Sequence, residues 1–200
     1  MDFKTLSKKK KAEVLEIIKS HLKQADADGL RRAMLSAGWL EGAGELVDPL
    51  MQLVCNGTGE VALAALEGLS SVRAAGSEQP IASYIMSQFK DPVPGREEVR
   101  AECIRVLGKV GTGRSVDFLA EVVVNPAATG QDREAAVEAL VSLGIENHGL
   151  REIETKLDTL RGKTEGHIRE AVDCALLELN RNQWEEKGFI TIEAELEKEE

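Results

Sequence analysis

The sequence of 200 residues predicts an all-α fold, a right-handed α-solenoid (superhelix) of about five antiparallel helix pairs. Three observations support this prediction. One helical pattern of apolar residues recurs along the chain, glycine and proline separate its copies, and the composition is typical of a helix array. Apolar residues make up 42% of the chain and aromatic residues only 4%, so Ala, Leu, Val and Ile must form the core.

The pattern is clearest in residues 97–111, EEVRAECIRVLGKVG. At 3.6 residues per turn, five apolar side chains of this segment fall on one stripe of a helix, with Arg100 at its edge. These five are Val99, Cys103, Val106, Leu107 and Val110.

The same spacing recurs at intervals of 33 to 38 residues, in segments 60–72, 132–144 and 168–180. A helical hairpin of this length cannot bury its apolar stripe alone and completes its core by stacking on its neighbours. The recurrence therefore predicts an array of hairpins.

The first two expected helices span residues 5–24 and 29–37. Lysines at 8–11 crowd the first turns of the former, and Asp26 or Asp28 can cap the latter. We interpret this pair as a degenerate first repeat.

The next helices are expected at 45–55, where Pro49 is tolerable only in the first turn, and at 60–72. Ser77 is the expected N-cap of a helix at 78–89. The prolines at 92 and 94 end that helix, because each removes a backbone donor and restricts the preceding residue.

The remaining helices are expected at 96–110, at 114–124, from Asp132 to about residue 144, at 150–160 and at 167–180. The valines at 122–124 are too short a run to indicate a strand. Asn147 is a candidate cap for the helix at 150–160, and residues 162–166 form the last turn.

The C-terminal segment departs from the repeats, because residues 189–196 alternate apolar and polar side chains as a strand does. This segment, with Trp184, either covers the open end of the last repeat or pairs with another chain, and the cap is favoured. The expected organisation is an N-terminal helix pair at 1–44, a repeat array at 45–180 and an acidic tail or cap at 181–200.

The form V-R-x-x-A-x-x-A-L-x-x-L-G, visible from Val99 to Gly111 and from Arg133 to Gly144, resembles HEAT repeats of the short type found in phycobilin-lyase-like proteins. The resemblance covers residues 45–180, although Ala62 replaces the arginine in the segment 60–72. It implies that the second helix of each pair lines a concave surface. It also implies that Arg100, Arg133 and Arg169 pair with acidic residues at interhelix turns, for which Asp91, Asp132 and Glu165 are available.

Charge and composition exclude several classes of partner. With 35 acidic and 25 basic residues the net charge is −10, which argues against nucleic acid, because binding there requires neutralised phosphates. No apolar run is long enough to span a membrane, and the N-terminus lacks the apolar segment of a signal peptide. We expect a cytoplasmic protein with no membrane partner, in which Cys55, Cys103 and Cys174 are reduced.

No residues indicate catalysis, a metal site or a bound cofactor, so we expect no enzyme activity. His21, His148 and His167 are too far apart in sequence to suggest a triad or a metal site, and Cys103 occupies a core position. The Gly-Thr-Gly-Arg segment at 111–114 precedes a helix, where phosphate can bind, but without a preceding strand or a following lysine a tight turn is the better interpretation.

The candidate partner-binding surface is the polar flank of the second helices. Its residues occupy equivalent positions of successive repeats and consist of six carboxylates and one basic spot: Glu60, Glu67, Glu98, Glu102, Arg105, Lys109, Glu138 and Glu178. Most such charges are only solvated. If the flank binds a partner, its charge predicts a basic or amphipathic segment of another protein.

The favoured hypothesis is a non-catalytic scaffold or adaptor for another protein. The resemblance implies an alternative, a HEAT-like subunit that assists a lyase-type enzyme handling a chromophore or cofactor. A helical-repeat DNA glycosylase is disfavoured because it needs a basic concave groove. The sequence does not determine the partner or the oligomeric state.

Overall fold

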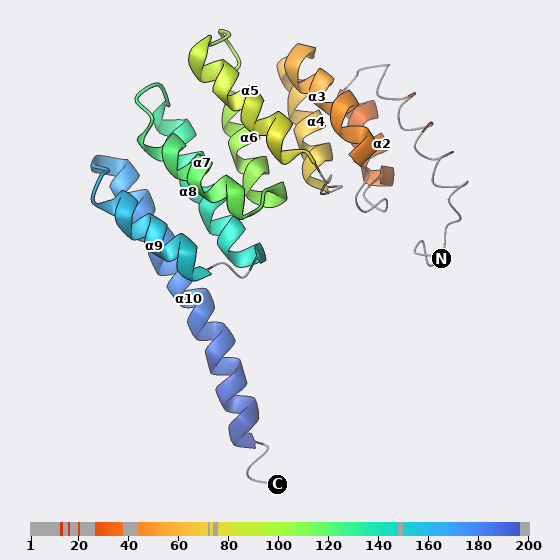
Figure 1. The fold of residues 1–200 in the computed structure, drawn as a ribbon. Coiled ribbons are helices and arrows are strands. Elements are labelled where there is room, and N and C mark those ends of the chain that lie inside the picture. Colours follow the sequence, from red (N-terminus) through yellow and green to blue (C-terminus); the bar gives the residue numbers. More distant parts are fainter. Residues whose placement is uncertain are drawn as a thin grey trace. The chain divides into compact units, whose positions relative to one another are not determined.

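The structure, a computed structural model, describes residues 13, 16, 20, 27–37, 44–71, 73, 76–147 and 150–196. Every regular element in these ranges is a helix and none is a strand, which confirms the all-α prediction (Figure 1). The helix expected at 5–24 lies outside the described residues, except that Glu13, Glu16 and Ser20 are helical.

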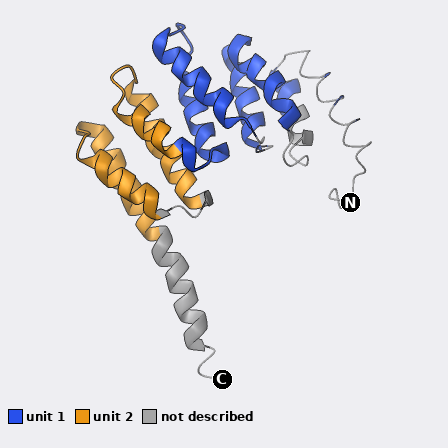
Figure 2. Cartoon of the chain, in the orientation of Figure 1, with its two compact units in different colours: residues 1–115 blue, residues 116–200 orange. Residues whose placement is uncertain are grey.

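The chain divides into two compact units, residues 1–115 and 116–200 (Figure 2). In the first unit, α4 contacts α2, α3 and α6, and α5 packs against α6. Consecutive helices therefore pack as pairs, α3 with α4 and α5 with α6, and the second members of the two pairs are in contact. The elements are α2 (Ala27–Ala37), a 3₁₀ turn (Gly44–Leu46), α3 (Val47–Asn56), α4 (Gly59–Ser71), α5 (Glu78–Lys90) and α6 (Glu97–Val110).

The boundary between the units falls within α7 (Gly113–Val124). The second unit continues with α8 (Gly130–Asn147), α9 (Leu150–Arg161) and α10 (Gly166–Leu196). These three helices contact one another, so α8 and α10 are packed second helices, as α4 and α6 are in the first unit.

The apolar stripe predicted for residues 97–111 is buried. Val99, Cys103, Val106 and Leu107 are at most 2% exposed, while Val110 is partly exposed. Arg100, expected at the edge of the stripe, is also buried, and its guanidinium lies over the Phe89 ring, 5.3 Å from the centroid. α6 contacts α4 and α5 in the first unit.

Helix ends largely follow the predicted breakers. Pro49 lies in the first turn of α3, the loop at 91–95 ends α5, and the valines at 122–124 are helical. α8 begins at Gly130, before Asp132, because Thr129 and Asp132 form a reciprocal capping box. Thr129 N donates to Asp132 Oδ2 at 2.8 Å, and Asp132 N donates to Thr129 Oγ1 at 3.2 Å.

One predicted cap is wrong. Ser77 precedes α5, but it makes no side-chain capping bond and its Oγ is buried without a hydrogen-bond partner. Its backbone is already helical (φ −74°, ψ −21°), whereas a capping residue has the extended conformation that directs its oxygen to the next turn. Asn147 is the last residue of α8, and its side chain lies outside the part of the chain that the structure describes, so its capping of α9 stays a prediction.

The strand expected at residues 189–196 is also wrong, because this segment is the final part of α10. A strand needs a neighbour for its backbone N–H and C=O groups, whereas a helix satisfies them within one segment. The segment 182–196 contains no proline, and its one glycine, Gly188, disfavours the helix by only about 1 kcal/mol.

Candidate partner-binding surface

In the first unit, the predicted binding residues lie on two helices in contact. Glu60 and Glu67 are on α4, and Glu98 and Glu102 are on α6 with Arg105 and Lys109. Glu102 and Arg105 are half-buried, and the other four are exposed.

Two of these four carboxylates have cationic neighbours within the chain. Arg31 Nε lies 3.4 Å from Glu67 Oε2, and Arg105 Nη1 lies 3.4 Å from Glu102 Oε2. Arg31 therefore adds a cation beside the flank of the first unit. Ion pairs with this degree of solvent exposure contribute little to stability.

In the second unit, the structure brings Glu138 of α8 and Glu178 of α10 to one groove between these helices, with a volume of about 450 Å³. Glu134 also lines this groove, which we call the α8–α10 groove. Its floor includes the buried side chains of Val137 and Val141. Three further residues line it, namely Ser142, Ala171 and Cys174.

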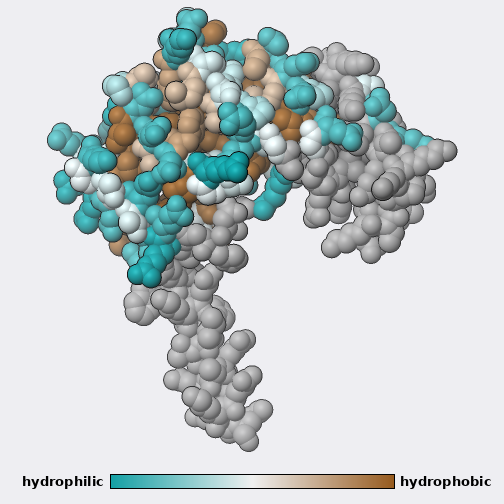
Figure 3. Space-filling view, viewed as in Figure 1, coloured by the Kyte–Doolittle hydropathy of each residue, from teal (hydrophilic) through white to brown (hydrophobic). Residues whose placement is uncertain are grey.

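On the visible face of the described residues, Figure 3 shows hydrophilic side chains interspersed with apolar ones. Among the described residues, the large apolar side chains that remain exposed are Met86, Val93, Val124, Ile145 and Leu177. Of these, Ile145 lines the α8–α10 groove.

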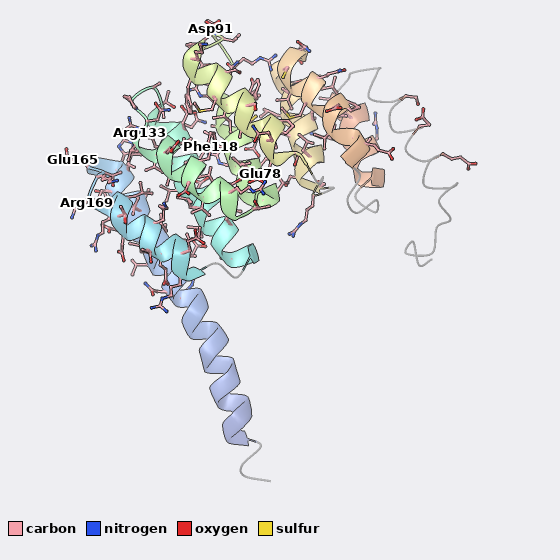
Figure 4. The ribbon with its side chains drawn as sticks, in the orientation of Figure 1. Glu78, Asp91, Phe118, Arg133, Glu165 and Arg169 are labelled. Atoms are coloured by element: carbon pink, nitrogen blue, oxygen red, sulfur yellow. The ribbon has the colours of Figure 1, made fainter. Side chains whose placement is uncertain are left out.

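Sequence reasoning missed the role of Glu78, at the start of α5 (Figure 4). Its carboxylate accepts hydrogen bonds from Thr112 N at 3.3 Å, Thr112 Oγ1 at 3.1 Å and Ser115 Oγ at 2.6 Å. Acidic residues are common in the first turn of a helix, where they interact favourably with the helix dipole. The sequence around Glu78 therefore does not indicate its hydrogen bonds to residues 34 and 37 positions later in the chain. The carboxylate occupies the place at the start of α7 where an external phosphate would bind, in agreement with the tight-turn interpretation of residues 111–114.

Arg96 is a second such residue. It lies just before α6, and its guanidinium donates to the carbonyl oxygens of Val54 at 3.0 Å, Cys55 at 3.3 Å and Gly57. These carbonyls belong to the C-terminal end of α3, where the helix dipole is negative and the last oxygens lack helical partners.

Two of the motif arginines, Arg133 and Arg169, lie in different surroundings. Arg133 donates from Nη2 to the carbonyl oxygen of Asn125 at 3.0 Å, and its Nε is buried without a partner, so its expected carboxylate pairing is wrong. Asn125 directly follows α7, so Arg133 binds a helix end, as Arg96 does. Arg169 lies near the start of α10 and is exposed (Figure 4). Asp91, in the loop before α6, and Glu165, in the loop before α10, are exposed as well.

Among the described residues, two cysteine thiols have raised pKa values. Burial raises the pKa of the Cys103 thiol well above its usual value, so the thiolate is disfavoured. Burial also raises the pKa of Cys55, an effect that Arg96 partly opposes. His167 Nε2 lies 3.8 Å from Glu134 Oε1, whereas His21 and His148 fall outside the described residues.

Two features are absent from the described residues. No group of His, Cys, Asp and Glu side chains there could hold a metal ion. Within the same ranges, no helix combines the length and apolar character needed to cross a bilayer.

Comparison with known proteins leaves the family undetermined. No model of a protein family matches the sequence, and no curated protein matches it. The HEAT-repeat assignment stays a prediction that depends on the repeated motif itself.

Proposed function

We propose that this chain is a non-catalytic interaction protein, a scaffold or adaptor whose helix pairs form a HEAT-like solenoid. One observation carries the proposal. Within each unit the second helices are in contact, and the flank residues selected from the repeat pattern lie on these neighbouring helices, α4 with α6 and α8 with α10. Repeat proteins use such a row of side chains to bind partners.

The charge of this flank determines the kind of partner. The flank carries four carboxylates on α4 and α6 and three around the α8–α10 groove, against the two basic residues Arg105 and Lys109, so its charge is predominantly negative. A negative field accelerates association with a positively charged segment, and added salt screens it. The partner is therefore a protein with a basic or amphipathic segment.

The test begins with identification of proteins that co-purify with the full chain from its native cell. Association rates with the purified partner are then measured over a range of ionic strength. Glu98→Lys with Glu102→Lys should slow association about tenfold at low salt, and salt should slow the wild type.

A matched control reverses Glu121 of α7 and Glu152 of α9, which are exposed on first helices. This double variant changes the net charge equally and should leave the rate within about twofold. Equal effects of both double variants, or the absence of a co-purifying protein, would contradict the proposed function.

A further inference from the structure

We propose that the α8–α10 groove binds an amphipathic helix of the partner, which inserts aliphatic side chains between the two helices and places Lys or Arg beside them. This inference rests on the proposed function and adds the position of the site and the class of ligand.

The groove has the size and the floor of a binding site. Its volume of about 450 Å³ lies within the range of roughly 300–1,000 Å³ typical of ligand pockets. Val137, Val141 and Ala175 contribute its buried floor, at 3%, 7% and 5% exposure. Ile145 is 43% exposed at the same groove, so a large aliphatic side chain there has room for an apolar neighbour.

The rim of the groove is acidic. Glu134 and Glu138 on α8 and Glu178 on α10 line it, and all three are exposed. Three carboxylates beside an apolar floor repel phosphates and acidic cofactors, and they favour a ligand that carries cations next to apolar groups.

Among the known modes of peptide recognition, binding of a partner's helix matches the α8–α10 groove best. Strand addition needs a sheet edge, and the described residues contain no strand. Proline-rich segments bind aromatic-lined grooves and phosphopeptides bind arginine clusters, whereas this groove is lined by neither aromatic residues nor arginines. A groove between two packed helices instead matches a third helix with anchors at positions i, i+3, i+4 and i+7.

Two exposed cysteines allow a direct test on the full chain. Cys174 lines the groove, and Cys55 at the end of α3 in the first unit does not. The probe is a designed helical peptide with leucines at i, i+3, i+4 and i+7 and lysines beside them. At a peptide concentration about ten times Kd, alkylation of Cys174 should slow about tenfold, because only unbound molecules react. Alkylation of Cys55, followed in the same sample by mass spectrometry, should not change.

The variants separate the apolar floor from the acidic rim. Ile145→Asp should weaken peptide binding about tenfold by placing a carboxylate at the apolar contact. Glu138→Lys with Glu178→Lys should weaken it at low salt and reduce its salt dependence. Glu121→Lys with Glu152→Lys, exposed residues of α7 and α9 that do not line the groove, is the matched control and should leave peptide binding unchanged.

Three results would overturn the inference: unchanged alkylation of Cys174, equal protection of Cys55, or equal binding of a peptide with the same composition and scrambled leucine spacing. The inference and the proposed function can fail separately. A partner sensitive to Glu98 and Glu102, with Cys174 unprotected by the peptide, would overturn only the groove inference. Protection of Cys174 without any co-purifying protein would support the groove inference and overturn the proposed function.

Discussion

Cys103 is the residue on which the helical register of α6 depends most directly. Its side chain is fully buried, and alanine takes the equivalent position, Ala136, in the next repeat. A small apolar side chain is therefore sufficient at this position, and a charge is not accommodated.

Cys103→Asp should lower the free energy of unfolding by about 3 kcal/mol or more, because it buries a carboxylate among apolar side chains. Cys103→Ala should cost only about 1 kcal/mol. Urea unfolding monitored by circular dichroism measures both. Cys174→Asp is the control, since the same change at this exposed position should have little effect. An aspartate variant as stable as the wild type would show that the assigned register is wrong.

Tyr84 contributes a pH dependence. Its hydroxyl is buried without a hydrogen-bond partner, and burial raises its pKa from 10.0 to about 12. Since the neutral phenol is favoured in the folded state, its contribution to stability is complete below pH 10 and is lost as the pH rises from 10 to about 12.

Tyr84→Phe should therefore be neutral or stabilising by up to about 1 kcal/mol at neutral pH and should flatten the loss of stability above pH 10. The chain contains one tyrosine, so tyrosinate absorbance reports this group alone. Titration of the folded protein at the pKa of free tyrosine would contradict the prediction.

At the scale of elements, side chains distant in the sequence form hydrogen bonds with the backbone at helix ends. Glu78 binds the N-terminal end of α7, and Arg96 binds the C-terminal end of α3. The negative Glu78 lies at the positive end of a helix dipole, and the positive Arg96 lies at the negative end of another.

Glu78→Gln should lower stability by about 1 kcal/mol, because the amide oxygen still accepts hydrogen bonds but carries no charge. Hydrogen exchange in the first turns of α7 should rise. Glu97→Gln, an exposed position in the first turn of α6, is the matched control and should leave α7 unaffected.

Arg96→Lys should cost about 1 to 2 kcal/mol although it preserves the charge, because lysine lacks the planar fork that reaches several carbonyls. Amide exchange near the end of α3 measures the local effect. Arg114→Lys, on the exposed first turn of α7, should be neutral. Equal stability of the two lysine variants would show that the bonds from Arg96 contribute nothing.

For the whole molecule, the two compact units predict a local response to core substitutions. Leu66 of α4 and Leu157 of α9 are both fully buried, one in each unit. Each Leu→Ala change should cost about 2 to 5 kcal/mol. Leu66→Ala should raise hydrogen exchange mainly in α3 to α6, and Leu157→Ala mainly in α8 to α10. An equal rise throughout both units would contradict this division.

The apolar stripes and the proline and glycine breakers are local signals, and the period of 33 to 38 residues relates one helix pair to the next. These patterns in the sequence were sufficient to predict the helices and most of their ends. The sequence also placed Glu138 and Glu178 on the polar flank of successive second helices, and both line one groove in the structure. The alternation at 189–196 misled because a short pattern indicates a strand only where another strand can pair with it.

Only the tertiary structure decided which distant groups meet. The bonds of Glu78 to Thr112 and of Arg96 to the end of α3 join residues more than 30 positions apart, and side-chain type alone does not predict them. The α8–α10 groove likewise depends on how two helices pack, and Arg133 binds a carbonyl where the motif suggested a carboxylate. Local spacing determines which face of a helix is apolar, whereas partners and cavities depend on distances that arise only when the helices are packed.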